Sequence, residues 1–170
     1  MESVIRTLDE LVERKIIEEY VIGGATALIY FSTPTLTEDI DVFVYMKEQR
    51  SLVDLSRIYE FLVEHKGATV EKEYVFIDRF PLQFLVPYDG LSDEAFKQAV
   101  LVEYGGLPVK IFSLEYLMAI MIQLNKAKYR ERLRLLIETQ IFDNIRLSAI
   151  LKRHGLMARW EILSRELTTP

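Results

Sequence analysis

The chain has 170 residues, half of them hydrophobic, and a net charge of −5, which fits one compact domain or a small domain with an appendage. It contains no cysteine, so disulfides, thiolate metal sites and cysteine nucleophiles are excluded, and its two histidines argue against a histidine-based zinc site. No stretch is apolar for long enough to span a bilayer and the first nine residues lack the apolar core of a signal peptide, so we expect a cytoplasmic protein without membrane association.

The first two thirds of the chain are predicted to alternate helices with strands. Apolar spacing and turn residues predict, in chain order, a helix over 4–17, a strand over 20–22, a helix over 25–31, a strand over 40–45, a helix over 51–66, strands over 69–77 and 82–86, a helix over 93–99, and a hairpin with strands over 101–103 and 109–112. The remainder contains only helical patterns, over 113–124, 130–139, 143–154 and 156–167. The predicted fold class is α+β, a mixed sheet flanked by helices, with one unit over 1–112 and a C-terminal helical segment over 113–170 packed on it.

Two glycines and two aspartates stand out in this pattern. Gly23 and Gly24 end the first strand, and glycines let a backbone approach a polyanion closely, while the helix that follows offers free N–H groups. Asp39 and Asp41 stand two positions apart at the next strand, where side chains alternate between faces, so their carboxylates should point the same way. Two carboxylates on one side can share a divalent cation. The pattern predicts that a nucleoside triphosphate and a metal ion bind side by side.

Each motif also has a purely structural interpretation. Asp39 and Asp41 could cap the preceding turn at a solvated strand edge, and Gly23-Gly24 could form a tight turn that needs a positive φ. Thr37 could bind a phosphate or cap the same turn, and capping is the favoured role. The combination of the glycine pair with the aspartate pair favours a nucleotide and metal role over capping for the two aspartates.

A basic run, Lys126, Lys128, Arg130, Arg132 and Arg134, stands out in an acidic chain. The net charge argues against a protein that coats nucleic acid regardless of sequence, but a local basic surface suits a small polyanion. On a continuous helix the first, third and fifth of these residues share one side, and the second and fourth lie about 160° away. The run is therefore either a solvated helix face or, in part, a phosphate site, with Lys128 near a predicted helix break as the expected contact.

The order of an apolar strand, a glycine pair, a short helix and Asp-x-Asp on the next strand resembles the minimal nucleotidyltransferase fold of the polymerase-β-like superfamily. More narrowly, it is similar to the small prokaryotic nucleotidyltransferases related to AbiEii-type toxins of toxin–antitoxin systems. The residues that carry the resemblance are Val21-Ile22-Gly23-Gly24 and Asp39-Ile40-Asp41. It implies that the glycines position the β- and γ-phosphates of an NTP, and that Asp39 and Asp41 are catalytic and bind Mg²⁺. In that family the metal bridges triphosphate oxygens while a hydroxyl attacks the α-phosphate and pyrophosphate leaves.

The chain departs from the family pattern at two points. The gap between Gly24 and Asp39 is longer than the family's usual spacing, and a loop around residues 33–36 could absorb the difference. The third acidic residue, which the family carries on a later strand, falls at Gln83, whose amide can coordinate a metal weakly but cannot take a proton. Asp78 or Glu73, from the same hairpin, could replace it.

Three functions stay open from the sequence. The first is Mg²⁺-dependent transfer of a nucleoside monophosphate from an NTP to a hydroxyl of RNA, a protein or a small molecule. The second is a nucleotide- or nucleic-acid-binding module whose catalysis is weakened by Gln83. The third is a toxin–antitoxin component that acts through a protein partner, and apolar residues on the last helices would equally serve a homodimer. Tyr88 and Tyr104, beside predicted turns, could stack on a base, although such aromatics more often belong to the core or its rim.

Overall fold

The computed structural model describes residues 1–31, 37–46 and 54–168. A seven-stranded mixed sheet with strand order β3-β4-β5-β2-β1-β7-β6 forms its centre. The strands are β1 (Glu19–Ile22), β2 (Ile40–Tyr45), β3 (Thr69–Glu71), β4 (Tyr74–Ile77), β5 (Phe80–Leu85), β6 (Val100–Tyr104) and β7 (Leu107–Ile111). The helices are α1 (Glu2–Glu13), α2 (Gly24–Tyr30), α3 (Ser56–Lys66), α4 (Gly90–Lys97), α5 (Leu114–Leu124), α6 (Ala127–Thr139), α7 (Asn144–Arg153) and α8 (Met157–Thr168).

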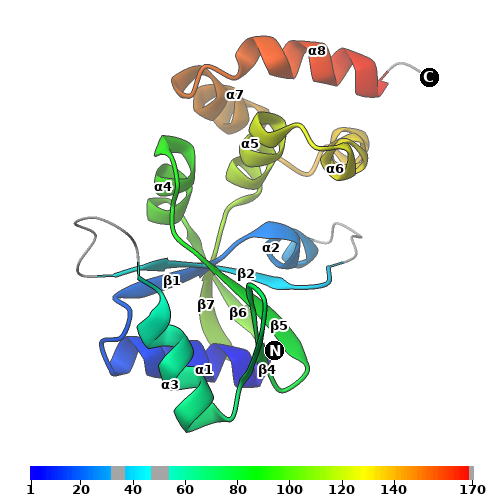
Figure 1. Cartoon of the computed structure of the whole chain (residues 1–170). Coiled ribbons are helices and arrows are strands. Elements are labelled where there is room, and N and C mark those ends of the chain that lie inside the picture. The colour runs from blue at the N-terminus through cyan, green and yellow to red at the C-terminus, as the bar shows by residue number, and fades with distance from the viewer. Residues whose placement is uncertain (32–36, 47–53, 169–170) are drawn as a thin grey trace.

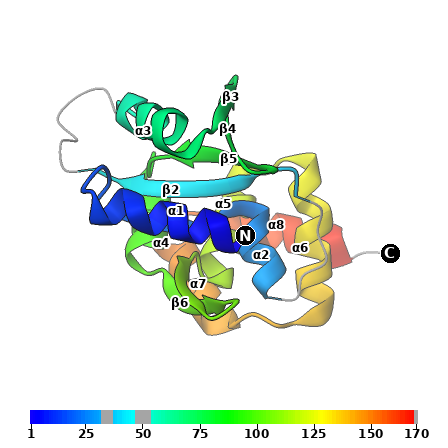
Figure 2. The same ribbon diagram turned by 90° about the horizontal axis from the view of Figure 1, so that it is seen from below.

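Helices cover both faces of the sheet. α1 and α3 lie on one face, and α2 lies on the other together with α4 to α8 (Figures 1 and 2). This arrangement confirms the predicted α+β class with a helical C-terminal segment. The proposed division between residues 112 and 113 stays a prediction, since α5 packs directly against α2 and α4 of the preceding part. Within the part of the chain that the structure describes, no helix is long and apolar enough to cross a membrane.

The pairing of β2 places three polar side chains in one row. β2 runs antiparallel to β1 and parallel to β5, so Asp41 lies beside Gln83. On the far side of β5, β4 runs antiparallel and places Tyr74 opposite Gln83. Side chains at paired positions of neighbouring strands point to the same face of a sheet. Asp41, Gln83 and Tyr74 therefore share one face, the one that α2 and the C-terminal helices cover.

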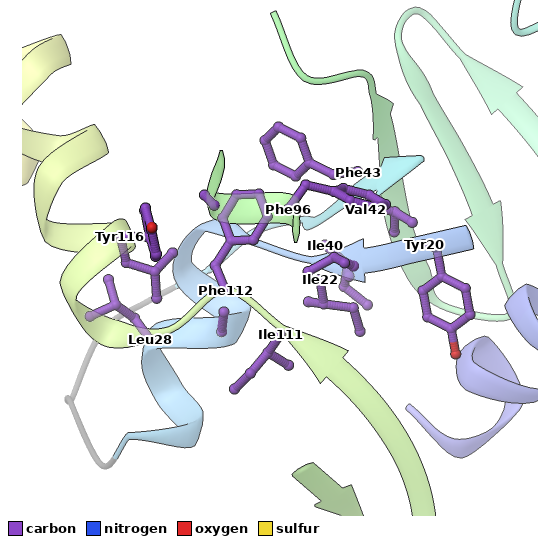
Figure 3. Packing of buried hydrophobic residues seen from close by; sticks show 14 of the residues in the cluster. Tyr20, Ile22, Leu28, Ile40, Val42, Phe43, Phe96, Ile111, Phe112 and Tyr116 are labelled. Atoms are coloured by element: carbon purple, nitrogen blue, oxygen red, sulfur yellow. The ribbon is translucent and has the colours of Figure 1, made fainter. Parts of the chain in front are cut away.

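α1 buries the apolar stripe that the sequence predicts. Tyr20 of β1 points toward α1 and donates a hydrogen bond of 2.8 Å to the carboxylate of Asp9 (Figure 3). The helix ends at Glu13, earlier than predicted, because Lys15 adopts a φ of 58°, which a right-handed helix cannot continue. The fully buried side chains of the stripe are Val4, Ile5, Leu8 and Leu11.

Aromatic rings pack on the face of β2 that also carries Asp41, among them Phe43 and Phe112 (Figure 3). The rings of Phe43 and Phe112 lie with their centroids 4.7 Å apart, and Tyr45 meets Phe96 of α4 edge to face at 4.4 Å. Such pairs contribute about 0.5–1.5 kcal/mol beyond the area they bury. They connect β2, the strand that carries Asp41, to the residue after β7 and to α4.

Several predicted boundaries are wrong. The strand predicted over 69–77 is a hairpin of β3 and β4, because Lys72 turns the chain with a φ of 56°. The helix predicted over 93–99 starts at Gly90, because the carboxylate of Asp89 accepts a 2.8 Å hydrogen bond from the backbone N–H of Ser92, whose hydroxyl in turn accepts from the N–H of Asp89. α3 starts at Ser56 rather than 51, and residues 51–53 lie outside the described residues.

Glu94 of α4 joins three helices. One carboxylate oxygen accepts hydrogen bonds from the hydroxyl of Tyr116 in α5 at 2.7 Å and from Nε of Arg153 in α7 at 3.0 Å. The other lies 2.7 Å from Nε2 of His154. Desolvation opposes ionisation of Glu94, but these hydrogen bonds outweigh it and lower the pKa to about 2. The carboxylate therefore stabilises the helical layer in its charged form.

Replacing Glu94 with Gln should lower the free energy of unfolding by about 1–3 kcal/mol near neutral pH, because hydrogen bonds to a charged group are lost. The folded-state pKa lies below the ordinary value of 4.5, so this contribution is complete above pH 4.5 and disappears as the pH falls toward 2. Urea unfolding measures the difference in unfolding free energy between the two proteins. This difference should be constant from about pH 7 to about pH 5 and smaller at about pH 3. Glu131→Gln, which removes an exposed pair with Arg134, is the matched control and should change stability by less than about 0.5 kcal/mol. A difference that does not depend on pH would contradict the ionic role.

Candidate functional site

A cavity of about 540 Å³ lies on the sheet face that carries Asp41 and Gln83. Its floor comes from the β1–α2 turn, β2, β4 and β5, and its opposite wall comes from α5 and the start of α6. The described residues that line it are Gly24, Ala25, Leu28, Thr37, Glu38, Asp39, Asp41, Phe43, Tyr74, Gln83, Leu85, Tyr88, Phe112, Leu117, Ile120, Met121, Leu124, Lys126, Lys128, Tyr129 and Arg132.

Asp39 and Asp41 both line the cavity, as the alternation along a strand predicts. Asp41 belongs to β2, whereas Asp39 lies just before it. The backbone carbonyl of Asp39 accepts hydrogen bonds from the hydroxyls of Thr37 at 2.6 Å and Thr26 at 3.3 Å. These two bonds hold the segment that leads into β2. Thr37 thus has the local capping role that the sequence favours, and it also lines the cavity.

The carboxylate of Asp41 is half-buried and lies close to the carboxylate of Asp39. Desolvation first, and the neighbouring carboxylate of Asp39 second, raise its pKa to about 6, while Lys128 and Arg132 act in the opposite direction. Two carboxylates this close, one of them desolvated, form a set of hard oxygen donors that a divalent cation would neutralise. Among the described residues, no group of three His, Cys, Asp or Glu side chains could hold a metal ion. The described part of the chain therefore offers a pair of carboxylates rather than a triad.

Gly24 leaves the space that the Asp41 side chain occupies. A Cβ on residue 24 would lie 1.7 Å from Oδ2 of Asp41, and Gly24 has a φ of +55°. Gly23 adopts extended backbone, and a Cβ there would lie 2.7 Å from the ring of Phe43. The backbone N–H of Gly23 donates a hydrogen bond of 2.9 Å to the carbonyl of Asp41. Both glycines are thus required by close packing, and only the second also needs a positive φ.

Helix α6 separates Lys128 and Arg132 from Arg130 and Arg134, as the helical period predicts, whereas Lys126, its N-cap residue, lies with the first pair rather than with the second. The helix starts at Ala127, before the predicted residue 130, so Lys128 lies in its first turn, close to the break between α5 and α6. Arg130 pairs with Glu166 of α8 at 2.8 Å, and Arg134 pairs with Glu131 at 3.3 Å. The basic residues of the run that line the cavity are Lys126, Lys128 and Arg132. Lys128 was the contact expected from the sequence, and Arg132 joins it because four residues make about one helical turn.

Three tyrosines lie around the carboxylates. Negative charge on Asp39 first, and burial second, raise the pKa of Tyr74. Burial raises the pKa of Tyr88 to about 12 and also raises that of Tyr129. All three phenols therefore stay protonated at neutral pH and offer O–H donors and aromatic faces. Of the two tyrosines considered in the sequence, Tyr88 lines the cavity, whereas Tyr104 is not among the described residues that do.

The structure places Gln83 in the cavity, directly beside Asp41 on the parallel strand β5. The position where the sequence expects a third acidic residue thus carries an amide. Asp78 and Glu73 are exposed in the turns at the two ends of β4, and neither is among the described residues that line the cavity. The structure therefore does not bring either candidate replacement to the site. Residues 33–36, expected to absorb the longer spacing, lie outside the described residues.

Gly24→Ala should destabilise the protein by about 1–3 kcal/mol more than Gly105→Ala does. Both residues have a positive φ, 55° and 59°, so both variants carry similar backbone strain. A Cβ at residue 105 would meet nothing within 4 Å, whereas one at residue 24 must displace the carboxylate of Asp41. Urea unfolding of the two variants measures the difference. Equal destabilisation would contradict the close approach of residues 24 and 41.

Comparisons with known proteins address the fold. No family model matches the chain, and no curated protein matches it either. Among solved structures, ANT(2″)-Ia in complex with adenylyl-2″-tobramycin is similar, with a TM-score of 0.55 and 19% identity over 92% of this chain and 97% of that one. A solution structure of the antibiotic-resistance factor ANT(2″)-Ia gives a TM-score of 0.53 and 18% identity over 97% and 96%. An antigenic nucleotidyltransferase-like protein from Paracoccidioides brasiliensis gives 0.59 and 16% over 96% and 90%. The narrower likeness to AbiEii-type proteins stays a prediction, but the chain has the fold of nucleotidyltransferases.

Proposed function

We propose that the cavity binds a nucleoside triphosphate with Mg²⁺ and that the protein transfers the nucleoside monophosphate to an acceptor. One observation carries the proposal. Asp39 and Asp41 on the sheet share a cavity with Lys128 and Arg132 on α6, and both cations act electrostatically on Asp41. Carboxylates for a metal ion and cations for phosphates are thus combined in one space, which is the arrangement that phosphoryl transfer uses.

The aspartate pair suits Mg²⁺. Carboxylate oxygens are the ligands that this ion prefers, and it commonly uses one or two of them together with phosphate oxygens and water. The missing Cβ of Gly24 leaves Oδ2 of Asp41 room on that side. When bound, the ion supplies positive charge that stabilises the triphosphate oxygens. Asp39 and Asp41 would hold it, and their own mutual repulsion would fall.

The cationic side of the cavity would hold the triphosphate. Arg132 can bind phosphate oxygens through two parallel N–H donors, and Lys128 acts as a point charge. Both cations flank the ring of Tyr129, with Nζ of Lys128 at 5.4 Å and Cζ of Arg132 at 5.9 Å from its centroid. Gly23 and Gly24 are proposed to let their backbone approach the β- and γ-phosphates. Thr37, on the sheet side, is proposed to support the segment that carries Asp39 through its bond to that residue. A direct phosphate contact by its hydroxyl stays a prediction.

The similar structures support this class of reaction. The ANT(2″)-Ia complex contains adenylyl-2″-tobramycin, a small molecule joined to a nucleoside monophosphate. The toxin–antitoxin and homodimer hypotheses stay predictions, because no contact within the chain bears on them.

Nucleotide binding without transfer is a second candidate function, favoured by Gln83 beside Asp41.

If transfer occurs, protein incubated with Mg²⁺ and each of the four NTPs labelled at the α-phosphate should release pyrophosphate and place label on an acceptor. Asp39→Ala and Asp41→Asn should each lower this transfer at least about tenfold, equivalent to about 1.4 kcal/mol. Asp78→Asn is the matched control and should change nothing, because Asp78 lies in an exposed turn with a φ of 54° that Asn tolerates. Mg²⁺-dependent NTP binding with no transfer to RNA, protein or small molecules would favour the second function.

Lys128→Ala and Arg132→Ala should each weaken NTP binding about tenfold, because each removes a charged donor that faces the cavity. Arg134→Ala should leave the dissociation constant within about twofold, because Arg134 pairs with Glu131 instead. Titration calorimetry with a non-hydrolysable NTP analogue measures all three variants. Comparable losses in all three would show that general electrostatics, rather than the cavity, hold the nucleotide.

A further inference from the structure

We infer that the acceptor in this cavity is a phosphate monoester, whose oxygen is already ionised at neutral pH, rather than a neutral alcohol. The inference rests on the proposed nucleotidyl transfer and adds the chemical class of the acceptor. Its basis is the set of side chains that lie beside the aspartate pair.

Among the described residues, the two neighbours of Asp41 along the sheet, Gln83 and Tyr74, are not bases. A base within hydrogen-bond reach that takes the proton of an alcohol is one common way in which an enzyme makes it a good nucleophile. The neighbour of Asp41 on β5 is Gln83, and the neighbour of Gln83 on β4 is Tyr74. The amide of Gln83 has no basic site, and the phenol of Tyr74 is by its chemistry an O–H donor at neutral pH. This row of the sheet can therefore orient an acceptor by hydrogen bonds, but it cannot activate an alcohol.

Glu38 is the remaining carboxylate among the described residues that line the cavity. It is exposed, it precedes β2, and it forms no metal-holding group of three with the two aspartates in the described part of the chain. No histidine is among the described lining residues either. The side chains beside the metal pair thus fit an acceptor that arrives without a proton to lose.

The charge of the opposite wall suits such an anion. The proposed triphosphate contacts use Lys128 and Arg132. Lys126, the N-cap residue of α6, is exposed and also lines the cavity, so α6 presents one cation beyond those assigned to the nucleotide. A second phosphate group next to the triphosphate would need such a cation to offset the repulsion between the two anions.

The reaction balances without a base. An oxygen of the acceptor phosphate attacks the α-phosphorus of the NTP and forms a new phosphoanhydride bond. The bond from the α-phosphorus to the bridging oxygen breaks, and pyrophosphate leaves with the electron pair. One phosphoanhydride replaces another, so no further reactant is needed, whereas transfer to a carboxylate would form a more reactive mixed anhydride. A phosphate monoester is therefore favoured over a carboxylate as well.

The test compares acceptors that differ only in the attacking group. Wild-type protein with Mg²⁺ and α-labelled NTP is given glycerol 3-phosphate, glycerol or glycerate, and separately a 3′-blocked oligoribonucleotide with a 5′-phosphate or a 5′-hydroxyl. Mass spectrometry identifies the bond formed. The phosphorylated member of one set should accept label at least about tenfold faster than its partners. The set that reacts distinguishes a small molecule from a nucleic-acid end.

Two variants sharpen the test. Gln83→Glu supplies the missing base and should raise transfer to the alcohol at least about tenfold, while Gln98→Glu, at the exposed end of α4, is the matched control. Lys126→Ala should raise the KM for the phosphorylated acceptor and leave NTP binding, measured by calorimetry, unchanged. If Gln83→Glu fails to fold in urea unfolding, the wild-type comparison and Lys126→Ala decide alone.

The possible results distinguish a wrong acceptor class from the absence of nucleotidyl transfer. Equal wild-type transfer to alcohol and phosphate, or transfer to the carboxylate alone, overturns the acceptor class and leaves nucleotidyl transfer standing. Alcohol transfer that Glu38→Gln abolishes identifies Glu38 as a base and also overturns the inference. No pyrophosphate release with any acceptor overturns nucleotidyl transfer itself.

Discussion

The side chain of Asp41 occupies the space where any residue other than glycine at position 24 would place its Cβ. This contact depends on two separate parts of the chain, the turn after β1 and the strand β2, which are joined by the antiparallel pairing of those strands and by the hydrogen bond from Gly23 to Asp41. Because the turn is glycine, the carboxylate can lie against the backbone instead of pointing into solvent. The depth of the cavity and the partial burial of Asp41 both follow from this one steric condition.

Burial of a carboxylate beside another carboxylate costs free energy unless positive charge lies near. The structure meets this condition from the opposite side of the cavity, where α6 presents Lys128 and Arg132. The other basic residues of the helix, Arg130 and Arg134, lie away from the cavity and are paired with Glu166 and Glu131. The electrostatics of the site are thus divided between a sheet that carries the negative charges and a helix that carries the positive ones.

The local part of this architecture could be predicted from the sequence. Alternation placed Asp39 and Asp41 on one side, the glycine pair marked the turn, and the helical period separated Lys128 and Arg132 from their neighbours. What escaped prediction depends on contacts between distant segments or on single backbone angles. Tyr74 reaches the site only because β4 pairs with β5, and the unrecognised hairpin turn at Lys72 hid that strand within a longer one. Tyr129 could not be assigned until α6 had a place opposite the sheet.

The start of α4 shows the same limit at a smaller scale. The helix was predicted to begin at residue 93, yet it begins at Gly90 after the N-cap residue Asp89, because Asp89 and Ser92 form a reciprocal capping box one turn earlier. Gln83 is the opposite case. The family resemblance assigned the position of the third acidic residue to Gln83, and the register of β2 with β5 has Gln83 beside Asp41.

The last helix has a bearing on a cavity that it does not line. α8 packs against α6, Glu166 pairs with Arg130, and Arg159 donates to the backbone carbonyl of Gln123 in α5. The side of α6 that faces away from the cavity is therefore supported by α8. A molecule that binds the outer side of α8 could therefore change the distance between the two charged walls without competing with a ligand in the cavity.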